Sequence, residues 1–196
     1  MARPRGTTVQ KEQVLKAAAR FFRAYGYHGT SMNELADAVG LKKASLYHHV
    51  TSKEQLIYEI LMTGMHSIIS QLREILDDPS LSPTDKLRCA IRAQIVAVTG
   101  DEAYVQTTVM TDGRVLSPEL QTEYIAARDT FEGQVKSIIR AGIETGEFKD
   151  CDVSLMAKAV LGICGWMVIW YHADGPKSPI EIADRFTEFL LSGLAT

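Results

Sequence analysis

The sequence predicts an all-α protein of about nine helices, with a short N-terminal helical domain ahead of a larger helical one. Apolar residues recur at intervals of three and four, and no stretch alternates apolar and polar residues as a half-buried strand would. Serine, proline and glycine stand where helices of ordinary length would begin and end. Hydrophobic residues make up 46% of the 196 residues and charged residues 23%, which favours a chain that folds around a core.

The first two helices are marked by an apolar stripe and by a capping motif. The stripe predicts a helix that ends at Gly26, because glycine is favoured just after a helix C-terminus. Ser31 and Glu34 then have the spacing of a capping box, which predicts a second helix that Gly40 closes after about two turns. The stripe consists of Val14, Ala17, Ala18, Phe21, Phe22 and Tyr25.

Residues 43–49 predict a third short helix, and a fourth begins close to Lys53. Both Thr51 with Glu54 and Ser52 with Gln55 have the spacing of a helix N-terminus, so the capping residue stays open between Thr51 and Ser52. Apolar positions then recur at helical spacing as far as about Leu76.

Three later helices share one start signal, a serine followed directly by a proline. Proline is favoured at the first helical position, where its missing N–H group would have no partner within the helix. Helical spacing of apolar residues adds a sixth and an eighth helix between them. The helices predicted in this part of the chain span residues 83–98, 102–111, 118–144, 153–171 and 179–194.

The eighth helix contains a run of 15 residues without a charge, from Ala159 to Ala173. Such a run is too short to span a bilayer comfortably, so no membrane partner is expected. A helix that is apolar nearly all round must be covered on more than one side, and we expect it to be buried.

The net charge of −3 conceals a strong asymmetry along the chain. Residues 1–53 carry nine Lys and Arg against three acidic residues, a net charge of +6. Residues 54–196 carry 12 basic and 21 acidic residues, a net charge of −9. A basic N-terminal segment followed by an acidic remainder indicates that only residues 1–53 bind a polyanion. A chance asymmetry of charge is the alternative.

The three cysteines suggest a reducing compartment. Cys89, Cys151 and Cys164 lie far apart and have the spacing of neither a metal site nor a disulfide framework. No apolar run follows the basic start of the chain, so no secretory leader is predicted. We therefore expect a cytoplasmic protein without a metal or a cofactor.

Two short helices joined by Val39, Gly40 and Leu41 predict a helix-turn-helix, since the sharp turn favours glycine. The second helix of such a pair lies in the major groove, where lysine donates to guanine and an alanine methyl can touch thymine. Hydroxyl and imidazole groups further along can donate to phosphates. The predicted DNA-binding residues are Lys42, Lys43, Ala44, Ser45, Tyr47, His48, His49 and Lys53.

Each of these signals has a plainer interpretation. Glycine between two short helices is common in helical proteins, and Tyr47 could equally pack in a core. His48 and His49 could be metal ligands, but neighbours on a helix point about 100° apart and chelate poorly.

An ordered series of motifs runs through this region: Val14-Leu15-Lys16-Ala17-Ala18, Phe21-Phe22, Tyr25-Gly26-Tyr27, Gly29-Thr30-Ser31-Met32, Glu34-Leu35-Ala36, Val39-Gly40-Leu41, residues 43–49 and residues 52–56. The series resembles the DNA-binding domain of the tetracycline-repressor (TetR) family and covers about a quarter of the chain. By that resemblance, six of the predicted residues match DNA-contacting positions, namely Lys43, Ser45, Tyr47, His48, His49 and Lys53. Val50 departs from the usual phenylalanine, which should alter core packing and leave the contacts unchanged.

The resemblance implies a repressor that binds a palindromic double-stranded operator as a homodimer built by its last two helices. Gly162 and Gly165 would permit close approach of helices there, and a four-helix interface across a two-fold axis would follow. A purely intramolecular core is the alternative. The predicted interface residues are Ile163, Trp170, Phe186, Phe189 and Leu190.

The resemblance also implies a ligand cavity among the middle helices, so we expect domains at 1–53 for DNA binding and 54–196 for ligand binding and dimerisation. Methionine and aromatic residues suit an adaptable apolar cavity, although each one singly is as well explained by core packing. Arg88, Arg92 and Arg128 could hold an anionic group or belong to a solvated face. The predicted ligand-binding residues are Met62, Met65, Ile69, Tyr104, Met110, Tyr124, Arg128, Phe131 and Trp166.

The C-terminal half is similar to regulators of fatty-acid and sterol degradation, from Arg128-Asp129 through Gly146-Glu147-Phe148 to Trp166, Ser178-Pro179 and Leu191-Ser192-Gly193-Leu194. Those regulators respond to CoA thioesters, so the resemblance implies a small-molecule effector of that class. A drug or an aromatic compound is the alternative effector. An enzyme is the alternative function, but no nucleophile elbow, Ser-His-Asp order or metal-spaced histidine cluster is present.

Overall fold

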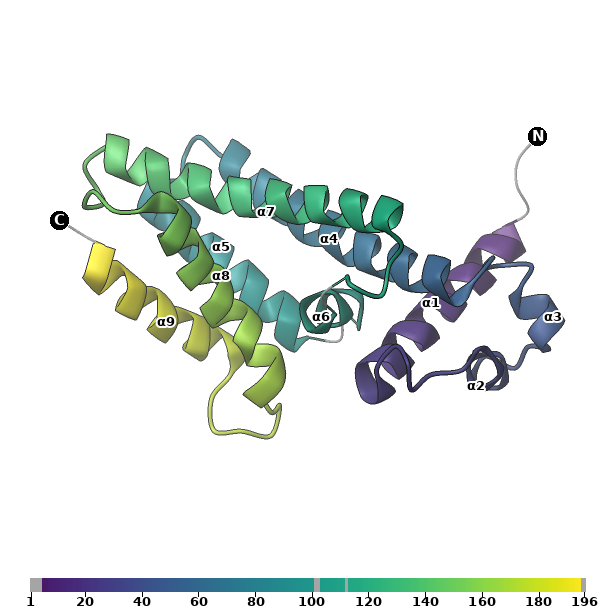
Figure 1. Ribbon diagram of the computed structural model, residues 1–196. Helices are drawn as coiled ribbons and strands as arrows, with labels where there is room; N and C mark the ends of the chain where they lie inside the picture. The colour runs from purple at the N-terminus through teal and green to yellow at the C-terminus, as the bar shows by residue number, and fades with distance from the viewer. Residues whose placement is uncertain (1–4, 101–102, 112, 195–196) are drawn as a thin grey trace. The chain divides into compact units, whose positions relative to one another are not determined.

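The computed structural model describes residues 5–100, 103–111 and 113–194, and the side chains of all of these except residues 5–10, 103, 105, 109 and 110. The predicted all-α fold is confirmed (Figure 1). The described part of the chain forms nine helices, as predicted: α1 (Arg5–Tyr25), α2 (Met32–Ala38), α3 (Lys43–Leu46), α4 (Lys53–Asp77), α5 (Pro83–Thr99), α6 (Ala103–Met110), α7 (Pro118–Glu144), α8 (Val153–Trp170) and α9 (Pro179–Leu194).

Capping side chains start the helices where the sequence places them. Ser31 Oγ accepts the Glu34 N–H at 3.2 Å while Glu34 accepts the Ser31 N–H at 2.8 Å, so the predicted capping box at α2 is complete. At α4 the open choice resolves to Ser52, whose Oγ accepts the Gln55 N–H at 2.9 Å. The three prolines begin α5, α7 and α9, because each occupies a position that needs no N–H donor.

The chain divides into two compact units whose boundaries differ from the expected break after residue 53. The first unit combines Met1–Gly64 with Ala103–Ile125, and the second combines Met65–Glu102 with Ala126–Thr196. Helix α6 joins the first unit because it hydrogen-bonds to earlier helices. Thr107 Oγ1 donates to the carbonyl of Ala19 at 3.1 Å, and Thr108 Oγ1 donates to that of Leu61 at 3.3 Å.

The first unit holds α1, α2, α3, α6 and the beginnings of α4 and α7 around one apolar core. Helix α1 packs against both α2 and α6. The hydroxyl of the buried Tyr124 donates to the carbonyl of Thr108 at 3.2 Å, which fixes the start of α7 on α6. The core includes Val14, Ala18, Phe22, Leu35, Leu46, Leu56, Ile57, Ile60 and Leu61.

In the second unit, α5 packs against both α8 and α9 (Figure 1). Leu87, Ile91 and Ile95 form the buried side of α5, four residues apart and therefore on one face. On its outer side, Arg92 pairs with Asp184 of α9 at 2.8 Å. Arg92 is one of the three arginines considered above as ligands for an anionic group, and here it is paired with a carboxylate.

The turn between α7 and α8 depends on a glycine without space for a side chain. A Cβ added to Gly142 would lie 2.1 Å from the ring of Phe148, which is itself buried. The ring therefore occupies the place of the missing side chain, and Phe148 N–H donates to the Gly142 carbonyl at 2.9 Å.

Gly142→Ala is expected to destabilise the second unit by about 1–3 kcal/mol, because the added methyl overpacks the site against Phe148. Gly133→Ala is the matched control on the same helix, since a Cβ there has nothing within 4 Å. It should be neutral or stabilise by up to about 1 kcal/mol, the helix preference of alanine over glycine. Urea unfolding of both variants measures the difference, and equal stabilities would contradict the packing described.

Candidate nucleic-acid interface, apolar face and cavity

A left-handed glycine makes the turn of the predicted helix-turn-helix. Gly40 has φ +67°, a conformation that side chains other than glycine rarely adopt. The N–H of Leu41 reaches back to the carbonyl of Ala36 at 2.9 Å, and that of Gly40 to Asp37 at 3.1 Å. These bonds satisfy the last carbonyls of α2 and redirect the chain into α3.

Helix α3 is shorter than predicted and tightens at its end. The α-helix ends at Leu46, and the chain continues as turns in which His48 N–H bonds to Ser45 and His49 N–H bonds to Leu46. Each of these bonds spans three residues, as in a 3₁₀-helix. Leu46 and Val50 are buried, which anchors one side of the segment and leaves its other side to solvent.

The predicted DNA-binding residues gather on that outer side. Lys42, Lys43, Ala44 and His48 are exposed, and Tyr47 is 43% exposed, whereas Ser45, His49 and Lys53 are half-buried. Among the residues that the structure describes, no carboxylate pairs with Lys42 or Lys43, and both ammonium groups are available to an anion.

Lys53 is held differently, by an aromatic ring that sequence reasoning did not assign to the site. Its Nζ lies 4.4 Å from the ring centroid of Tyr27, within the range of a cation–π contact. Partial burial lowers the pKa of Lys53, and the nearby Glu34 carboxylate opposes that shift. Tyr27 therefore positions the ammonium at the start of α4, where free helical N–H groups also favour an anion.

The second unit exposes an apolar face on α8 and α9. Its residues are named here as the apolar face: Leu155, Trp166, Ile169, Trp170 and Phe189, exposed by 66, 64, 53, 40 and 71%. The opposite side of α8 is buried through Ala157, Val160, Cys164 and Met167. The expectation that α8 is covered on more than one side is therefore wrong for a single chain.

The predicted interface residues divide between this face and the core. Trp170 and Phe189 belong to the apolar face, Ile163 and Phe186 are half-buried beside it, and Leu190 is buried within the unit. Trp166, predicted as a ligand contact, is one of the exposed residues of the apolar face. By length and composition alone, α8 is also the one helix in the described chain that could cross a membrane.

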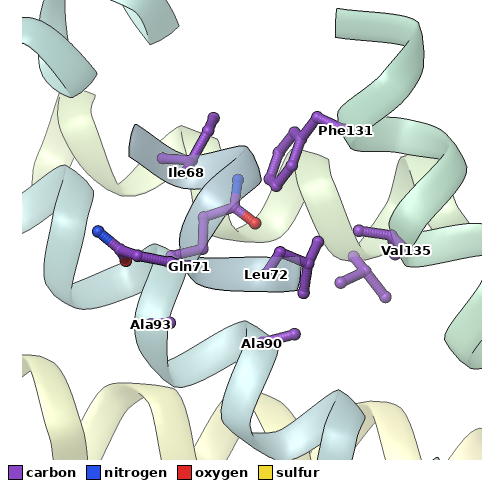
Figure 2. Close-up of a pocket in the computed structure, with 9 residues that line it drawn as sticks. Ile68, Gln71, Leu72, Ala90, Ala93, Phe131 and Val135 are labelled. Atoms are coloured by element: carbon purple, nitrogen blue, oxygen red, sulfur yellow. The ribbon is translucent and has the colours of Figure 1, made fainter. Parts of the chain in front are cut away.

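A small cavity lies inside the second unit, between α4, α5, α7 and α8 (Figure 2). Its volume of about 20 Å³ is room for roughly one water molecule. The walls are mostly apolar, and two glutamines are the polar residues among them. The lining residues are Ile68, Gln71, Leu72, Ala90, Ala93, Gln94, Phe131, Val135 and Val160.

Of the nine residues predicted to bind a ligand, Phe131 alone lines this cavity. Met62, Tyr104 and Tyr124 belong to the first unit, while Met65, Ile69 and Arg128 belong to the second but do not line the cavity. The side chain of Met110 falls outside the described residues. Sequence reasoning missed Gln71 and Gln94, whose signal is an Ile-x-x-Gln pattern repeated on α4 and α5.

No group of three or more His, Cys, Asp or Glu that could hold a metal is present in the described part of the chain.

Comparisons with known proteins agree over nearly the whole chain. Residues 14–60 match the profile of bacterial regulatory proteins of the tetR family, and residues 80–194 match the tetracyclin repressor-like C-terminal domain. The HTH-type transcriptional repressor KstR2 of Mycolicibacterium smegmatis is 27% identical, over 94% of this chain and 90% of its own.

Two solved structures extend the likeness. PfmR, a TetR family regulator from Thermus thermophilus, is 34% identical with a TM-score of 0.85, over 94% of this chain and 100% of that one. AibR, solved in complex with isovaleryl coenzyme A and operator DNA, is 29% identical with a TM-score of 0.86, over 93% and 98%.

Proposed function

The chain belongs to the TetR family of bacterial regulatory proteins, and from that membership we propose that it is a cytoplasmic repressor that an acyl-CoA releases from its operator. The observation that carries the proposal is the exposed pair Lys42 and Lys43 on the solvent side of a helix-turn-helix, with no carboxylate partner among the described residues. KstR2 and PfmR are named as transcriptional regulators, and the proposal includes no catalytic step.

Two copies of the chain would bind one operator. The apolar face is the surface that we assign to dimerisation, because its five large apolar side chains are exposed in the single chain, and large exposed apolar surfaces mark interaction sites. A two-fold axis would then present two basic segments, Lys42–Lys53, to major grooves about one helical turn or a multiple apart.

The effector class is supported by the relatives. AibR is solved with isovaleryl coenzyme A, and KstR2 is named a repressor. The cavity holds roughly one water molecule, so an acyl group could enter only if α4, α5, α7 and α8 move apart. Helix α4 lines the cavity through Gln71 and begins at Lys53, so its movement would shift the equilibrium away from the DNA-binding state.

A second candidate effector is a neutral apolar or aromatic compound. The cavity lining contains Phe131 and no basic residue, which favours an uncharged occupant. Once the helices had moved apart, a CoA thioester would enter with its acyl part alone and leave its phosphates outside. Mass spectrometry of small molecules that co-purify with the protein would separate the two candidates.

Lys43→Ala is expected to weaken DNA binding by about three- to tenfold and to reduce the slope of log K against log salt by about one, because it removes one positive charge from the contact with the duplex. Lys53→Ala should act in the same direction. The probe is a duplex that the protein selects from random-sequence DNA, titrated by fluorescence anisotropy between 50 and 200 mM salt, about the range over which such contacts respond.

Lys149→Ala is the matched control, an exposed lysine in the second unit, and should leave both affinity and slope unchanged. Unchanged affinity in both Lys43→Ala and Lys53→Ala would overturn the DNA assignment. In the same assay, isovaleryl-CoA and decanoyl-CoA should release the duplex while free CoA should not. Retention of the duplex with every thioester would overturn the effector class and leave the DNA assignment standing.

A further inference from the structure

An open hollow lies on the first unit, between the two helices of the helix-turn-helix. Its volume is about 460 Å³, far more than the room for one water molecule in the second unit. The polar residues that line it are Asn33 and Asp37 on α2 and Lys42 and Lys43 at the start of α3, and all four are exposed. The hollow therefore places a carboxylate near two ammonium groups on the surface that we assign to DNA.

The carboxylate of Asp37 stands at the turn that leads into α3. Asp37 is the last residue but one of α2, and its backbone carbonyl accepts the Gly40 N–H at 3.1 Å. It is therefore close to the N-terminus of α3, the end of a recognition helix that meets base edges. Among the described residues, its carboxylate accepts no hydrogen bond and joins no ion pair, although Lys42 and Lys43 line the same hollow. All of its acceptor capacity is available to a bound duplex.

A carboxylate on this surface needs a hydrogen-bond donor from the duplex, because the phosphates repel it. In the major groove, thymine and guanine present acceptors, and the N6 donor of adenine lies beside the acceptor N7, which repels a carboxylate. Cytosine presents the N4 amine, a donor, without an acceptor beside it. A G·C pair therefore complements the hollow, since the acceptors of guanine suit a lysine and the amine of cytosine suits Asp37.

We propose that Asp37 is a specificity-determining residue, which accepts a hydrogen bond from N4 of one cytosine in each operator half-site, while a lysine of the hollow donates to the guanine of that pair. Phosphate contacts fix the register of a DNA-binding protein, whereas a contact to a base edge adds a sequence preference. The inference rests on the proposed function for the duplex itself, and it adds the base pair that is read.

The test compares the duplexes that the unaltered protein, Asp37→Ala and Asp150→Ala select from random-sequence DNA. Alanine removes the acceptor and is favoured within a helix, so Asp37→Ala should fold. Asp150 is an exposed acid of the second unit, and its replacement is the matched control. The unaltered protein and the control should prefer cytosine by about five- to tenfold at one position of each half-site. Asp37→Ala should lose that preference and keep the others.

A base analogue then tests the single hydrogen bond. Pyrimidin-2-one in place of that cytosine lacks only the N4 amine, and by anisotropy it should weaken binding of the unaltered protein about five- to tenfold more than binding of Asp37→Ala. Equal losses in the two proteins, or unchanged base preferences in Asp37→Ala, would overturn the inference and leave the DNA assignment standing. If the unaltered protein selects no duplex, the proposed function itself fails, and the inference fails with it.

Discussion

Replacing Trp166 by aspartate is expected to separate the homodimer into single chains and to weaken DNA binding by at least about a hundredfold. Trp166 is 64% exposed within the apolar face, where the second chain would cover it. Tryptophan near the centre of an interface contributes about 2–4 kcal/mol, and a buried, unpaired carboxylate adds a desolvation cost. Each separated chain keeps only half of the phosphate contacts, which lowers DNA affinity further.

Val96→Asp is the matched control for this prediction. Val96 is another exposed apolar residue of the second unit, 46% exposed, but it lies on α5 outside the apolar face. Sedimentation equilibrium should show a dimer for Val96→Asp and a monomer for Trp166→Asp. A stable dimer of Trp166→Asp with full DNA affinity would move the interface elsewhere.

Leu46→Asp is expected to abolish DNA binding while the second unit stays folded and dimeric. Leu46, the last residue of α3, is fully buried, so the new carboxylate would have to enter the core of the first unit without a partner. The cost of several kcal/mol is a large fraction of the stability of a small domain. The second unit owes its core to other residues, among them Leu87, Ile91 and Ile95.

Leu46→Met keeps the volume and apolarity of the side chain and should retain DNA binding within a few fold. Anisotropy measures the DNA affinity, and sedimentation with calorimetry on a bound thioester reports on the second unit. Loss of the dimer in Leu46→Asp would show that the two units do not fold independently, and full DNA affinity would contradict the burial of Leu46.

Helix boundaries were predictable because they depend on local chemistry. Serine caps and prolines act within one turn of the residues that they order, so α7 and α9 begin and end within a residue of the predicted positions. The end of α3 was less predictable. Its short α-helical part ends at Leu46, because Leu46 and Val50 must both reach the core and the chain tightens between them.

The exposed basic segment near α3 was predictable from sequence, and the lining of the cavity was not. The basic residues near α3 are consecutive in sequence, so one surface segment carries them together. The cavity brings Gln71, Gln94 and Phe131 together from three helices, and periodicity alone cannot tell which core positions leave a space. The same holds for α6, whose bonds to Ala19 and Leu61 join segments 88 and 47 residues apart.

The exposed side of α8 was not predicted from the sequence. A helix that is apolar nearly all round was expected to be covered, and the single chain covers only the side of Ala157, Val160, Cys164 and Met167. Composition does not distinguish burial within one chain from burial between two. The uncovered half is therefore what a symmetric partner would bury.

The central claim is that two copies of the segment Lys42–Lys53 engage one duplex together, and half-site spacing tests it most directly. Native mass spectrometry and anisotropy would follow the selected duplex before and after five base pairs, about half a helical turn, are inserted between its half-sites. We predict two chains per original duplex and a loss of at least about a hundredfold in affinity after the insertion, because the second half-site then faces away. One chain per duplex, bound equally well before and after the insertion, would contradict the claim.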